Sequence, residues 1–406
     1  MSGGVDSSVA AALLRKRGFD VIGIHIKMWA PLEARANGAA APTSRRGLPL
    51  MGWRPVETEK PETRNLKPET VYRFDGVCRQ QVEDRHDAMR VAAKLDIPFQ
   101  TWNFTEEYRR AVVEYMVREY AAGRTPNPDV MCNRHIKFGL FLRRALEAGT
   151  DYIATGHYVR LETRDQRLEI RKNNTGELSP SLYSLVSARD ANKDQSYFLW
   201  TLTQGQLKYC LFPIGEYTKP EVRAMARKFG LPTAEKPDSQ GICFIGEIDI
   251  REFLRRYISE RRGRVLSTAG KAIGEHPGVE FYTIGQRQGL GIGGGIPYYV
   301  AEKDTSTNTL VVAEGPYDEK LFRRELVVAD INWIFDRKPE LPLRCLARIR
   351  YRQPLQRCTV TGIMKHDSCF MIHVRFDEPQ RAVTPGQSVV FYQSGEMLGG
   401  GIIRET

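Results

Sequence analysis

Residues able to bind phosphate open the chain. They are Ser2, Gly3, Gly4, Val5, Asp6 and Ser7. The glycines predict a tight loop, and the apolar spacing that follows, closed by basic residues and Gly18, predicts an amphipathic helix. Such a loop presents backbone N–H groups and the positive end of a helix dipole at one point, which favours phosphate. No Gly-Lys-Ser/Thr follows the glycines, so this is not a Walker loop. The alternative is a glycine turn before an ordinary helix.

A reactive cysteine is predicted at Cys132. It follows Asn127, Pro128 and Asp129, and the prolines on either side of Asn127 stiffen the backbone and fix the separation of Asp129 from Cys132. A cysteine that opens a helix among the basic residues of 134–137 should carry more thiolate than an ordinary cysteine. The alternatives are a buried structural cysteine and an Asp129 that only caps the helix instead of acting as an acid or base.

Two other polar stretches are ambiguous when only their residues are considered. Cys243 lies between glycines and apolar residues on an expected loop, where a structural cysteine is the commoner interpretation. Lys193, Asp194 and Gln195 precede an apolar run. Lys193 and Gln195 are able to hold a phosphate or a base edge, or they are simply solvated.

Alternation over residues 343–352 predicts a strand with a basic face. Period two places Arg348, Arg350 and Arg352 together on an exposed face, next to Tyr351. A basic stripe beside an aromatic ring suits an RNA backbone, and a solvated barrel face explains the pattern equally well.

The composition is that of a globular protein with several domains. The chain has 406 residues, of which 41% are hydrophobic and 27% charged, enough for two or three cores. A net charge of +11 suits a polyanion such as RNA, although many basic proteins bind none. No apolar run approaches the roughly 18 residues of a membrane span, so no membrane association is expected. The seven cysteines are odd in number and widely spaced, which argues against a disulfide framework or a zinc ribbon and for a reducing compartment.

Strand candidates alternate with helices in the first half of the chain. Residues 20–26, 97–104 and 151–155 are short apolar runs separated by helical patterns, which predicts an α/β fold with a doubly wound parallel sheet and ligands at the carboxyl ends of its strands. Residues 31–70 lack periodicity and are expected to be a disordered insertion. Residues 160–192 are expected to be a polar surface excursion.

The second half has a different pattern. Residues 204–284 are predicted to be mostly helical, and beyond residue 298 short β runs split by turns predict a small barrel or sandwich.

Taken together, the motifs resemble the tRNA-specific 2-thiouridylases, which are PP-loop ATP pyrophosphatases. The motifs are Ser-Gly-Gly-Val-Asp-Ser-Ser, Gly-Arg-Thr-Pro-Asn-Pro-Asp-Val-Met-Cys-Asn, Ala-Thr-Gly-His-Tyr, Lys-Asp-Gln-Ser-Tyr-Phe-Leu, Gly-Ile-Cys-Phe-Ile-Gly and Thr-Ile-Gly-Gln-Arg-Gln-Gly-Leu-Gly-Ile-Gly-Gly. The resemblance implies a PP-loop ATP pyrophosphatase catalytic domain over 1–205, a small central domain over 206–290 and a C-terminal β-barrel over 291–406 that helps to grip tRNA.

The chemistry implied by the resemblance is the replacement of the 2-carbonyl oxygen of the wobble uridine by sulfur. ATP, expected with Mg²⁺, adenylates that oxygen, because a carbonyl oxygen leaves poorly and an adenylate leaves well. Cys243 matches the cysteine that carries the sulfur as a persulfide. Cys132 matches the partner that releases it, either by leaving a disulfide or by freeing hydrosulfide, so a loop-borne Cys243 is expected to reach Cys132. A sulfur-relay protein or a cysteine desulfurase is the implied persulfide donor.

The resemblance also assigns binding residues. ATP would be held by the loop 2–7 and Gly156, with Ile26 lining the adenine pocket where the family often has Met. The target base would face Asn127, Pro128 and Asp129. The residues implied to contact tRNA are His157, Lys193, Asp194, Gln195, Arg350, Tyr351 and Gln387.

One departure from the family pattern leaves alternatives. The family's loop follows a buried strand, and none precedes Ser2, so we expect a missing N-terminal strand and weak ATP binding. The alternatives are an inactive or truncated RNA-binding relative, or another PP-loop enzyme such as an amidotransferase or a tRNA lysidine synthetase, neither of which needs two cysteines. Some thiolases use an iron–sulfur cluster instead of a persulfide. The long insertions favour a eukaryotic mitochondrial matrix protein over a bacterial cytoplasmic one.

Overall fold

The computed structural model describes residues 1–28, 75–164, 182–238, 249–293, 295–366 and 369–406. The expected insertion over 31–70 and the Cys243 motif lie outside these ranges. Within them, no helix is both long and apolar enough to cross a bilayer.

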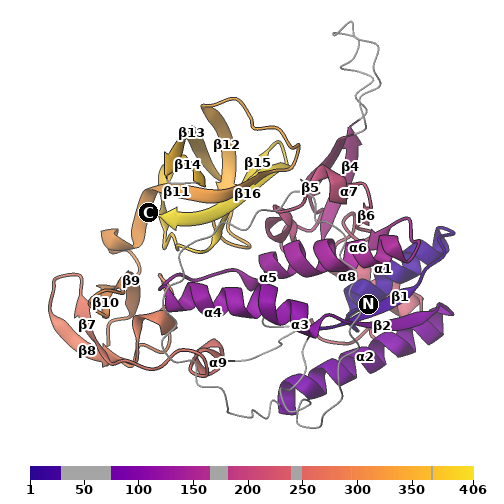
Figure 1. The fold of residues 1–406 in the computed structure, drawn as a ribbon, viewed down its shortest axis with the longest axis horizontal. Coiled ribbons are helices and arrows are strands. Elements are labelled where there is room, and N and C mark those ends of the chain that lie inside the picture. Colours follow the sequence, from indigo (N-terminus) through magenta and orange to yellow (C-terminus); the bar gives the residue numbers. More distant parts are fainter. Residues whose placement is uncertain (29–74, 165–181, 239–248, 294, 367–368) are drawn as a thin grey trace, which may run out of the picture.

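Parallel strand pairs and helices form the N-terminal part (Figure 1). Strand β1 (Gly23–Lys27) pairs in parallel with β2 (Phe99–Asn103), and β3 (Ile153–Ala154) pairs in parallel with β6 (Cys210–Leu211). The first helix, α1 (Val5–Lys16), buries its Val, Ala and Leu side chains in a cluster shared with α2 and α8. This arrangement confirms the predicted α/β class, although the described parallel strands of this N-terminal part form two separate pairs.

The helices of this part include one that begins at the predicted reactive cysteine. They are α2 (Asp75–Leu95), α3 (Thr105–Tyr108), η2 (Arg109–Val113), α4 (Glu114–Ala121), α5 (Pro128–Met131), η3 (Cys132–Phe141), α6 (Leu142–Glu147), η6 (Ser196–Leu199), α7 (Gln204–Leu207) and α8 (Lys219–Lys228). Segments α5, η3 and α6 follow one another without a break, and we call residues 128–147 the Cys132 helix. Its η3 segment has π-helical hydrogen bonds, a distortion that often marks functional sites.

The polar excursion expected over 160–192 is in part a β-hairpin. Strands β4 (Val159–Arg164) and β5 (Leu182–Ser187) pair antiparallel, and Val186 of β5 pairs with Glu396 of the C-terminal barrel. The sequence prediction missed these strands, and the middle of β5 is buried beside the barrel instead of being a polar surface.

A mixed four-stranded sheet follows a short helix, α9 (Ile250–Leu254). Its strands are β7 (Gly263–Ser267), β8 (Ala272–His276), β9 (Tyr298–Asp304) and β10 (Thr309–Glu314), in the order β8-β7-β10-β9. The helical prediction for 204–284 was therefore wrong over β7 and β8. The boundary expected between residues 290 and 291 falls between two strands of this one sheet, and we propose to place it after Glu314 instead.

Six antiparallel strands close into the C-terminal barrel, as predicted. They are β11 (Phe322–Trp333), β12 (Leu343–Arg348), β13 (Gln356–His366), β14 (Cys369–Arg381), β15 (Ser388–Gln393) and β16 (Glu396–Glu405). The order β11-β14-β13-β12-β15-β16 is closed by pairing of β16 with β11. Alternate residues such as Val328, Val360, Val374 and Phe391 are fully buried and fill the interior.

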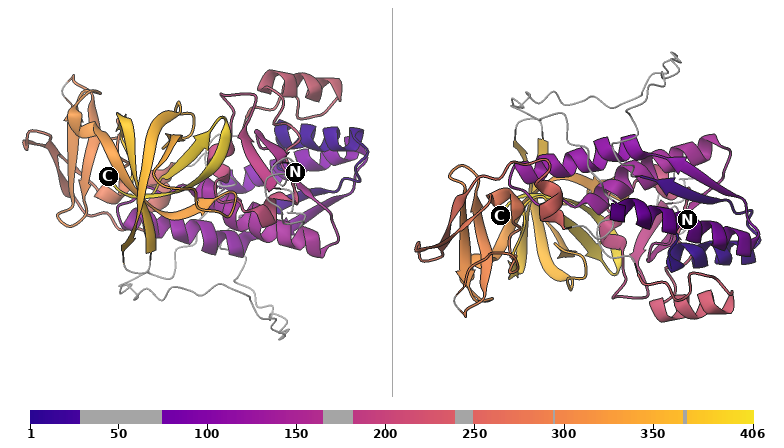
Figure 2. Two further views of the ribbon diagram at one scale, coloured as in Figure 1. Left: turned by 90° about the horizontal axis from the view of Figure 1, so that it is seen from above. Right: turned by 90° about the horizontal axis from the view of Figure 1, so that it is seen from below.

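The barrel and the four-stranded sheet lie at one end of the molecule, and α1, β1 and β2 lie at the other (Figure 2). Helix α4 and the Cys132 helix extend between the two ends (Figure 1). One large apolar cluster includes buried residues from all three regions, among them Trp102, Phe281 and Tyr392.

Candidate active site

The predicted phosphate loop surrounds the start of α1. Gly4 is the N-cap residue and no side chain caps this helix end, so amides of the first turn stay available for an anion. Gly3 has φ of +75°, and a Cβ there would lie 2.2 Å from the carbonyl oxygen of Asp84. The Ser2 and Ser7 hydroxyls are 3.1 Å apart and close the loop on itself.

Gly156, from the segment that follows β3, packs directly onto this loop. A Cβ at Gly156 would lie 2.8 Å from the backbone nitrogen of Ser7. Both glycines are therefore needed for close backbone approach, and the structure brings together the loop and Gly156 as the resemblance implied. Ile26 is half-buried on the neighbouring strand β1.

A network of ion pairs connects the phosphate loop to the residues just ahead of Cys243. Lys219 Nζ is 2.7 Å from Asp6 of the loop and 2.8 Å from Asp238. Asp238 also pairs with Lys193 at 2.5 Å and with Arg223 at 2.7 Å. Burial opposes ionisation of Asp238, but hydrogen bonds from Lys193 and Lys219 outweigh it and lower the pKa of Asp238 to about 2. The carboxylate is thus ionised at neutral pH, and Lys219 links Asp238 to Asp6 of the loop.

Cys132 lies at the start of the π-helical segment and is fully buried. Its Sγ is 4.0 Å from Sδ of Met28, the residue that follows β1. Of the basic residues expected nearby, Arg134 and His135 are exposed and Lys137 is half-buried. Cys132 is thus a buried thiol within the large apolar cluster, at the start of the helical segment where the sequence predicted it.

The residues before Cys132 form a fixed helix start. The Asn127 side-chain oxygen accepts a hydrogen bond from the backbone N–H of Val130 at 3.2 Å, and Pro128 occupies the first turn, where its missing N–H costs nothing. Asn127 is therefore the capping residue, and Asp129 lies half-buried in the first turn.

Two residues expected to contact tRNA are instead buried. Asp194 accepts from the backbone N–H groups of Ala188 and Ser196 and pairs with Arg348 of β12 at 3.3 Å. His157 packs against Phe138 and Phe212, and its Nδ1 lies 2.8 Å from the Thr155 hydroxyl. Burial, with a contribution from the charge of Lys137, holds the pKa of His157 well below its usual value.

Gln195 also bonds within the protein. Its side-chain oxygen accepts from the backbone N–H of Tyr158 at 2.9 Å. The hydroxyl of Tyr158 in turn donates to Asp6 at 2.8 Å. Gln195 thus supports a residue that bonds the phosphate loop.

The prediction of an exposed basic face over residues 343–352 is wrong. Strand β12 ends at Arg348, which is buried against Asp194, and the chain turns over the following residues. Arg350 donates to the carbonyl oxygens of Ile284 and Ala382, and the Tyr351 ring packs on Phe198 at 4.7 Å. Gln387 donates to the carbonyl oxygens of Thr125 and Pro126.

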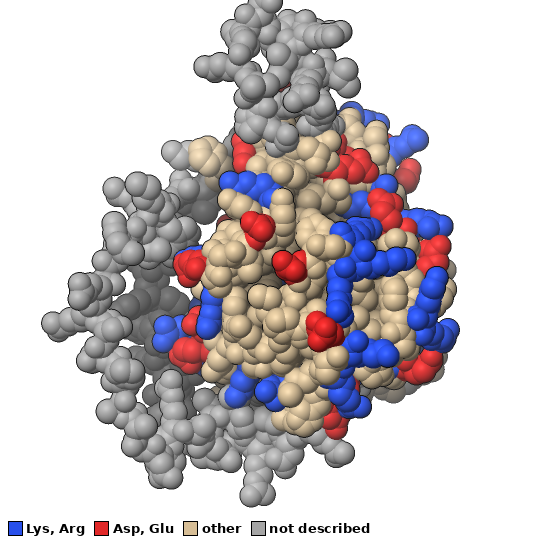
Figure 3. Space-filling view, turned by 90° about the vertical axis from the view of Figure 1, so that its right-hand side faces the viewer, with Lys and Arg blue, Asp and Glu red and all other residues tan. Residues whose placement is uncertain are grey.

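Lys and Arg side chains do gather elsewhere. Figure 3 shows many of them along one side of a face of the molecule, with several acidic residues among them. This grouping fits the net charge of +11 and suits a phosphate backbone.

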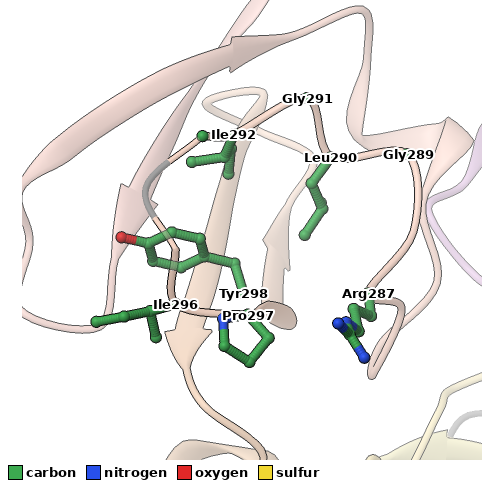
Figure 4. Close-up of a pocket in the computed structure, with 9 residues that line it drawn as sticks. Arg287, Gly289, Leu290, Gly291, Ile292, Ile296, Pro297 and Tyr298 are labelled. Carbon is green, nitrogen blue, oxygen red and sulfur yellow. The ribbon is translucent and has the colours of Figure 1, made fainter.

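Neither of two surface cavities encloses the phosphate loop. One, of about 360 Å³, lies beneath the glycine-rich loop 289–293 and is lined by Arg287, Leu290, Ile296 and Tyr298 (Figure 4). The other, of about 310 Å³, is lined by residues that include Thr283, Arg350 and Gln387. Within the described ranges, no group of three or more His, Cys, Asp or Glu side chains is arranged to hold a metal ion.

Three family models match consecutive parts of the chain. They are the tRNA methyl transferase HUP domain over residues 1–48 and 62–247, the tRNA methyl transferase PRC-barrel domain over 251–314 and the aminomethyltransferase beta-barrel domain over 323–403.

Curated relatives match the whole chain. The tRNA-specific 2-thiouridylase MnmA of Geobacillus thermodenitrificans is 45% identical, covering 100% of this chain and 93% of the relative. The proteins of that name from Streptococcus sanguinis and Halalkalibacterium halodurans are each 43% identical, covering 99% of this chain and 93% of the relative. The chain belongs to the tRNA-specific 2-thiouridylase family.

Sequence reasoning missed several residues around the phosphate loop. Lys219, Arg223 and Tyr158 contact Asp6 or Asp238 but stand in none of the assigned roles. One signal was present for Lys219, because Thr218 and Glu221 form a capping box that predicts a helix start at this lysine. Nothing local in the sequence indicated that this helix start would face the phosphate loop.

Proposed function

We propose that this protein is a tRNA 2-thiouridylase that uses ATP to replace the 2-carbonyl oxygen of the wobble uridine by sulfur. The observation that carries the proposal is the bridge made by Lys219 between Asp6 in the phosphate loop and Asp238, just ahead of Cys243. Activation of the base and delivery of sulfur must occur at one place, and this bridge ties the two segments together.

ATP would bind at the start of α1. The amides of the first turn and the helix dipole would face the phosphates, and Gly3 and Gly156 allow the close backbone packing that shapes the loop. Mg²⁺, when bound with ATP, would neutralise phosphate charge, with oxygen ligands that include the phosphates themselves. The adenylated uridine then has AMP as its leaving group.

Sulfur would come from a persulfide on Cys243. In one route, the Cys132 thiolate attacks the inner sulfur of the persulfide, forms a Cys132–Cys243 disulfide and releases hydrosulfide, which displaces AMP from the base. In the other route, the outer sulfur attacks the base first and Cys132 then releases it. A thiol reductant restores both cysteines. Asp129, in the first turn before Cys132, would face the base together with Asn127 and Pro128, and acts as acid or base there.

The buried thiol of Cys132 fits a role late in the reaction. Cys132 is fully buried, with its Sγ beside Sδ of Met28, and burial limits the access of oxidants to the thiol.

A thiolation assay tests the proposal. The protein is incubated with ATP, Mg²⁺, a persulfide donor and tRNA with a wobble uridine, and product is detected by retardation in a mercury-containing gel. We expect Cys132→Ser and Cys243→Ser each to lower the rate by roughly a thousandfold or more while tRNA affinity stays unchanged. Thiolation that survives both substitutions would overturn the two-cysteine mechanism.

Other functions predict different results. An inactive or truncated relative would bind tRNA without consuming ATP, and a tRNA lysidine synthetase would consume ATP without needing either cysteine. The family models carry methyl transferase names, so S-adenosylmethionine with tRNA is the control substrate pair. Full-length relatives named as thiouridylases favour sulfur transfer over all three.

The partners follow from this chemistry. We propose a sulfur-relay protein or a cysteine desulfurase as the source of the persulfide. The relatives compared above are bacterial, which gives no support to the mitochondrial matrix, and we propose the bacterial cytoplasm as the compartment.

A further inference from the structure

A turn of the C-terminal barrel grips the loop that leads into the Cys132 helix. We call residues 385–387 the barrel turn and residues 124–127 the entry loop. The backbone N–H of Thr125 donates to the carbonyl oxygen of Pro385 at 2.9 Å. The Gln387 side-chain nitrogen donates to the carbonyl oxygens of Thr125 at 2.9 Å and Pro126 at 3.0 Å. Three hydrogen bonds therefore join the two segments, which are far apart in sequence.

The Gln387 side chain is committed to this contact. Both of its partners are backbone carbonyls, which only accept, so the amide nitrogen must face them and both of its hydrogens are used. Only the amide oxygen is left for another molecule. A residue that bound tRNA through its amide donors would instead keep them open to solvent.

Gly386 is required for the close approach. Its φ is +94°, and a Cβ there would lie 2.8 Å from the carbonyl oxygen of Thr125. The barrel holds this glycine rigidly, because its N–H donates to Ile403 of β16 and the N–H of Ile403 donates back to Gln387. The contact with the entry loop is therefore anchored on strand β16 of the barrel.

The central part of the chain contacts the same point. Thr125 Oγ1 lies 3.1 Å from Thr283 Oγ1, and Arg350 of the barrel donates to Ile284 at 3.2 Å. The entry loop, the central part and the barrel all meet around the buried Thr125.

The reactive stretch comes directly after the entry loop. Asn127 caps α5, Asp129 lies in its first turn, and Cys132 opens the π-helical segment one turn later. A displacement of Thr125 and Pro126 would move the cap and shift both reactive side chains. Displacements near 1 Å cost roughly a hundredfold in rate at catalytic groups.

We propose that the barrel turn is a positioning element for the thiolation reaction, in which Gly386 and Gln387 set the entry loop and hence Asp129 and Cys132. Gln387 then acts on the reaction through protein contacts and not by donating hydrogen bonds to tRNA. The expected effects on the reaction rate rest on the proposed function. The expected effects on structure rest only on the contacts described above.

Two substitutions remove the grip in different ways. Gln387→Met keeps the side-chain length but removes both donors, and Gly386→Ala inserts a methyl group against Thr125. Gly395→Ala is the matched control, since Gly395 has φ of +83° in the same barrel and a Cβ there meets nothing within 4 Å. All three, with the double variant of 386 and 387, are compared for the turnover number at saturating tRNA, the dissociation constant for tRNA and the thermal midpoint.

We expect Gln387→Met and Gly386→Ala each to lower the turnover number by roughly 10- to 100-fold, with tRNA affinity within about twofold of the parent. Their effects should combine less than additively, because both break one contact. Gly395→Ala should keep the parent turnover number. Weaker tRNA binding at an unchanged turnover number in Gln387→Met would overturn the proposal in favour of a direct tRNA contact, as would additive effects in the double variant.

A second measurement needs no activity. Cys132 is fully buried, and alkylation of its peptide by iodoacetamide, followed by mass spectrometry without ATP or tRNA, reports its exposure. We expect labelling to accelerate at least about fivefold in Gln387→Met and Gly386→Ala but not in Gly395→Ala, and equal labelling in all four proteins would overturn the proposal. A parent that fails to thiolate tRNA would refute the proposed function, while the labelling rates would still test the barrel turn.

Discussion

At the scale of single residues, burial decides the role of a polar side chain. His157 looks like a nucleic-acid contact in sequence, yet it lies between two aromatic rings and bonds Thr155. Its role in the folded chain is to pack as a neutral imidazole beside Gly156 and the phosphate loop. A neutral buried histidine makes stability depend on pH, because the unfolded chain protonates more readily than the folded one.

We predict that the free energy of unfolding falls as pH drops below about 6.5, the usual value for His157. Below that pH the unfolded state binds the proton and the folded state does not, so each pH unit costs up to about 1.4 kcal/mol from this group. His157→Gln should reduce the slope measured by urea denaturation between pH 6.5 and 5. His86→Gln, at an exposed position on α2, is the control and should leave the slope unchanged. A slope that is the same in parent and His157→Gln would contradict the prediction.

At the scale of elements, α1 shows how a helix start becomes a binding site. Its apolar residues are buried and fix the helix, while its first turn lacks a side-chain cap and faces the glycines of the loop and of segment 155–157. Two glycines flank this helix, Gly3 before it and Gly18 after it, both with positive φ.

We predict that Gly3→Ala lowers ATP affinity at least about tenfold, because the methyl group would strike the Asp84 carbonyl and displace the loop. Gly18→Ala carries a comparable backbone strain of about 1–2 kcal/mol but meets no atom within 4 Å. It should lower stability and leave ATP affinity unchanged in isothermal titration. Equal ATP affinity in the two variants would show that the loop does not bind the nucleotide.

Sequence periodicity predicted the elements that local patterns determine. Helix α1, strands β1 to β3 and the barrel were all visible as apolar spacings or alternations. The hairpin of β4 and β5 was missed because its outer partner is β16, and the 343–352 stripe failed because Asp194 draws Arg348 inward. The motifs indicated phosphate chemistry directly and sulfur chemistry through the family resemblance. The roles of Lys219 and of the barrel turn depend on contacts between segments far apart in the sequence, which local patterns do not show.

At the scale of the whole molecule, a buried ion pair joins the barrel to the α/β part. Arg348 of β12 and Asp194 have side-chain exposures of 9% and 2%, and nearby Tyr197 donates to Ser388 of β15 at 2.9 Å. Removing one partner of such a pair leaves the other charge buried without compensation.

We predict that Arg348→Met lowers the free energy of unfolding by about 3 kcal/mol or more. Arg344→Met is the control, because Arg344 lies on the same strand but pairs with Asp377 at the surface with 68% of its side chain exposed. Arg344→Met should lower the free energy of unfolding by less than about 1 kcal/mol. Urea denaturation at pH 7 compares the two variants. Similar losses of unfolding free energy would show that the buried ion pair does not stabilise the contact between the barrel and the α/β part.

The position of the barrel turn late in the sequence also affects the order in which parts of the site can form during translation. The phosphate loop and the Cys132 helix leave the ribosome early, but the turn that holds the entry loop is anchored on Ile403 of β16, which follows every other described strand and helix in the chain. A nascent or prematurely terminated chain thus carries the reactive cysteine without the contacts that hold it in place. An unfinished polypeptide therefore lacks the geometry proposed for thiolation, and its Cys132 thiol is expected to be more accessible to reagents than in the finished chain.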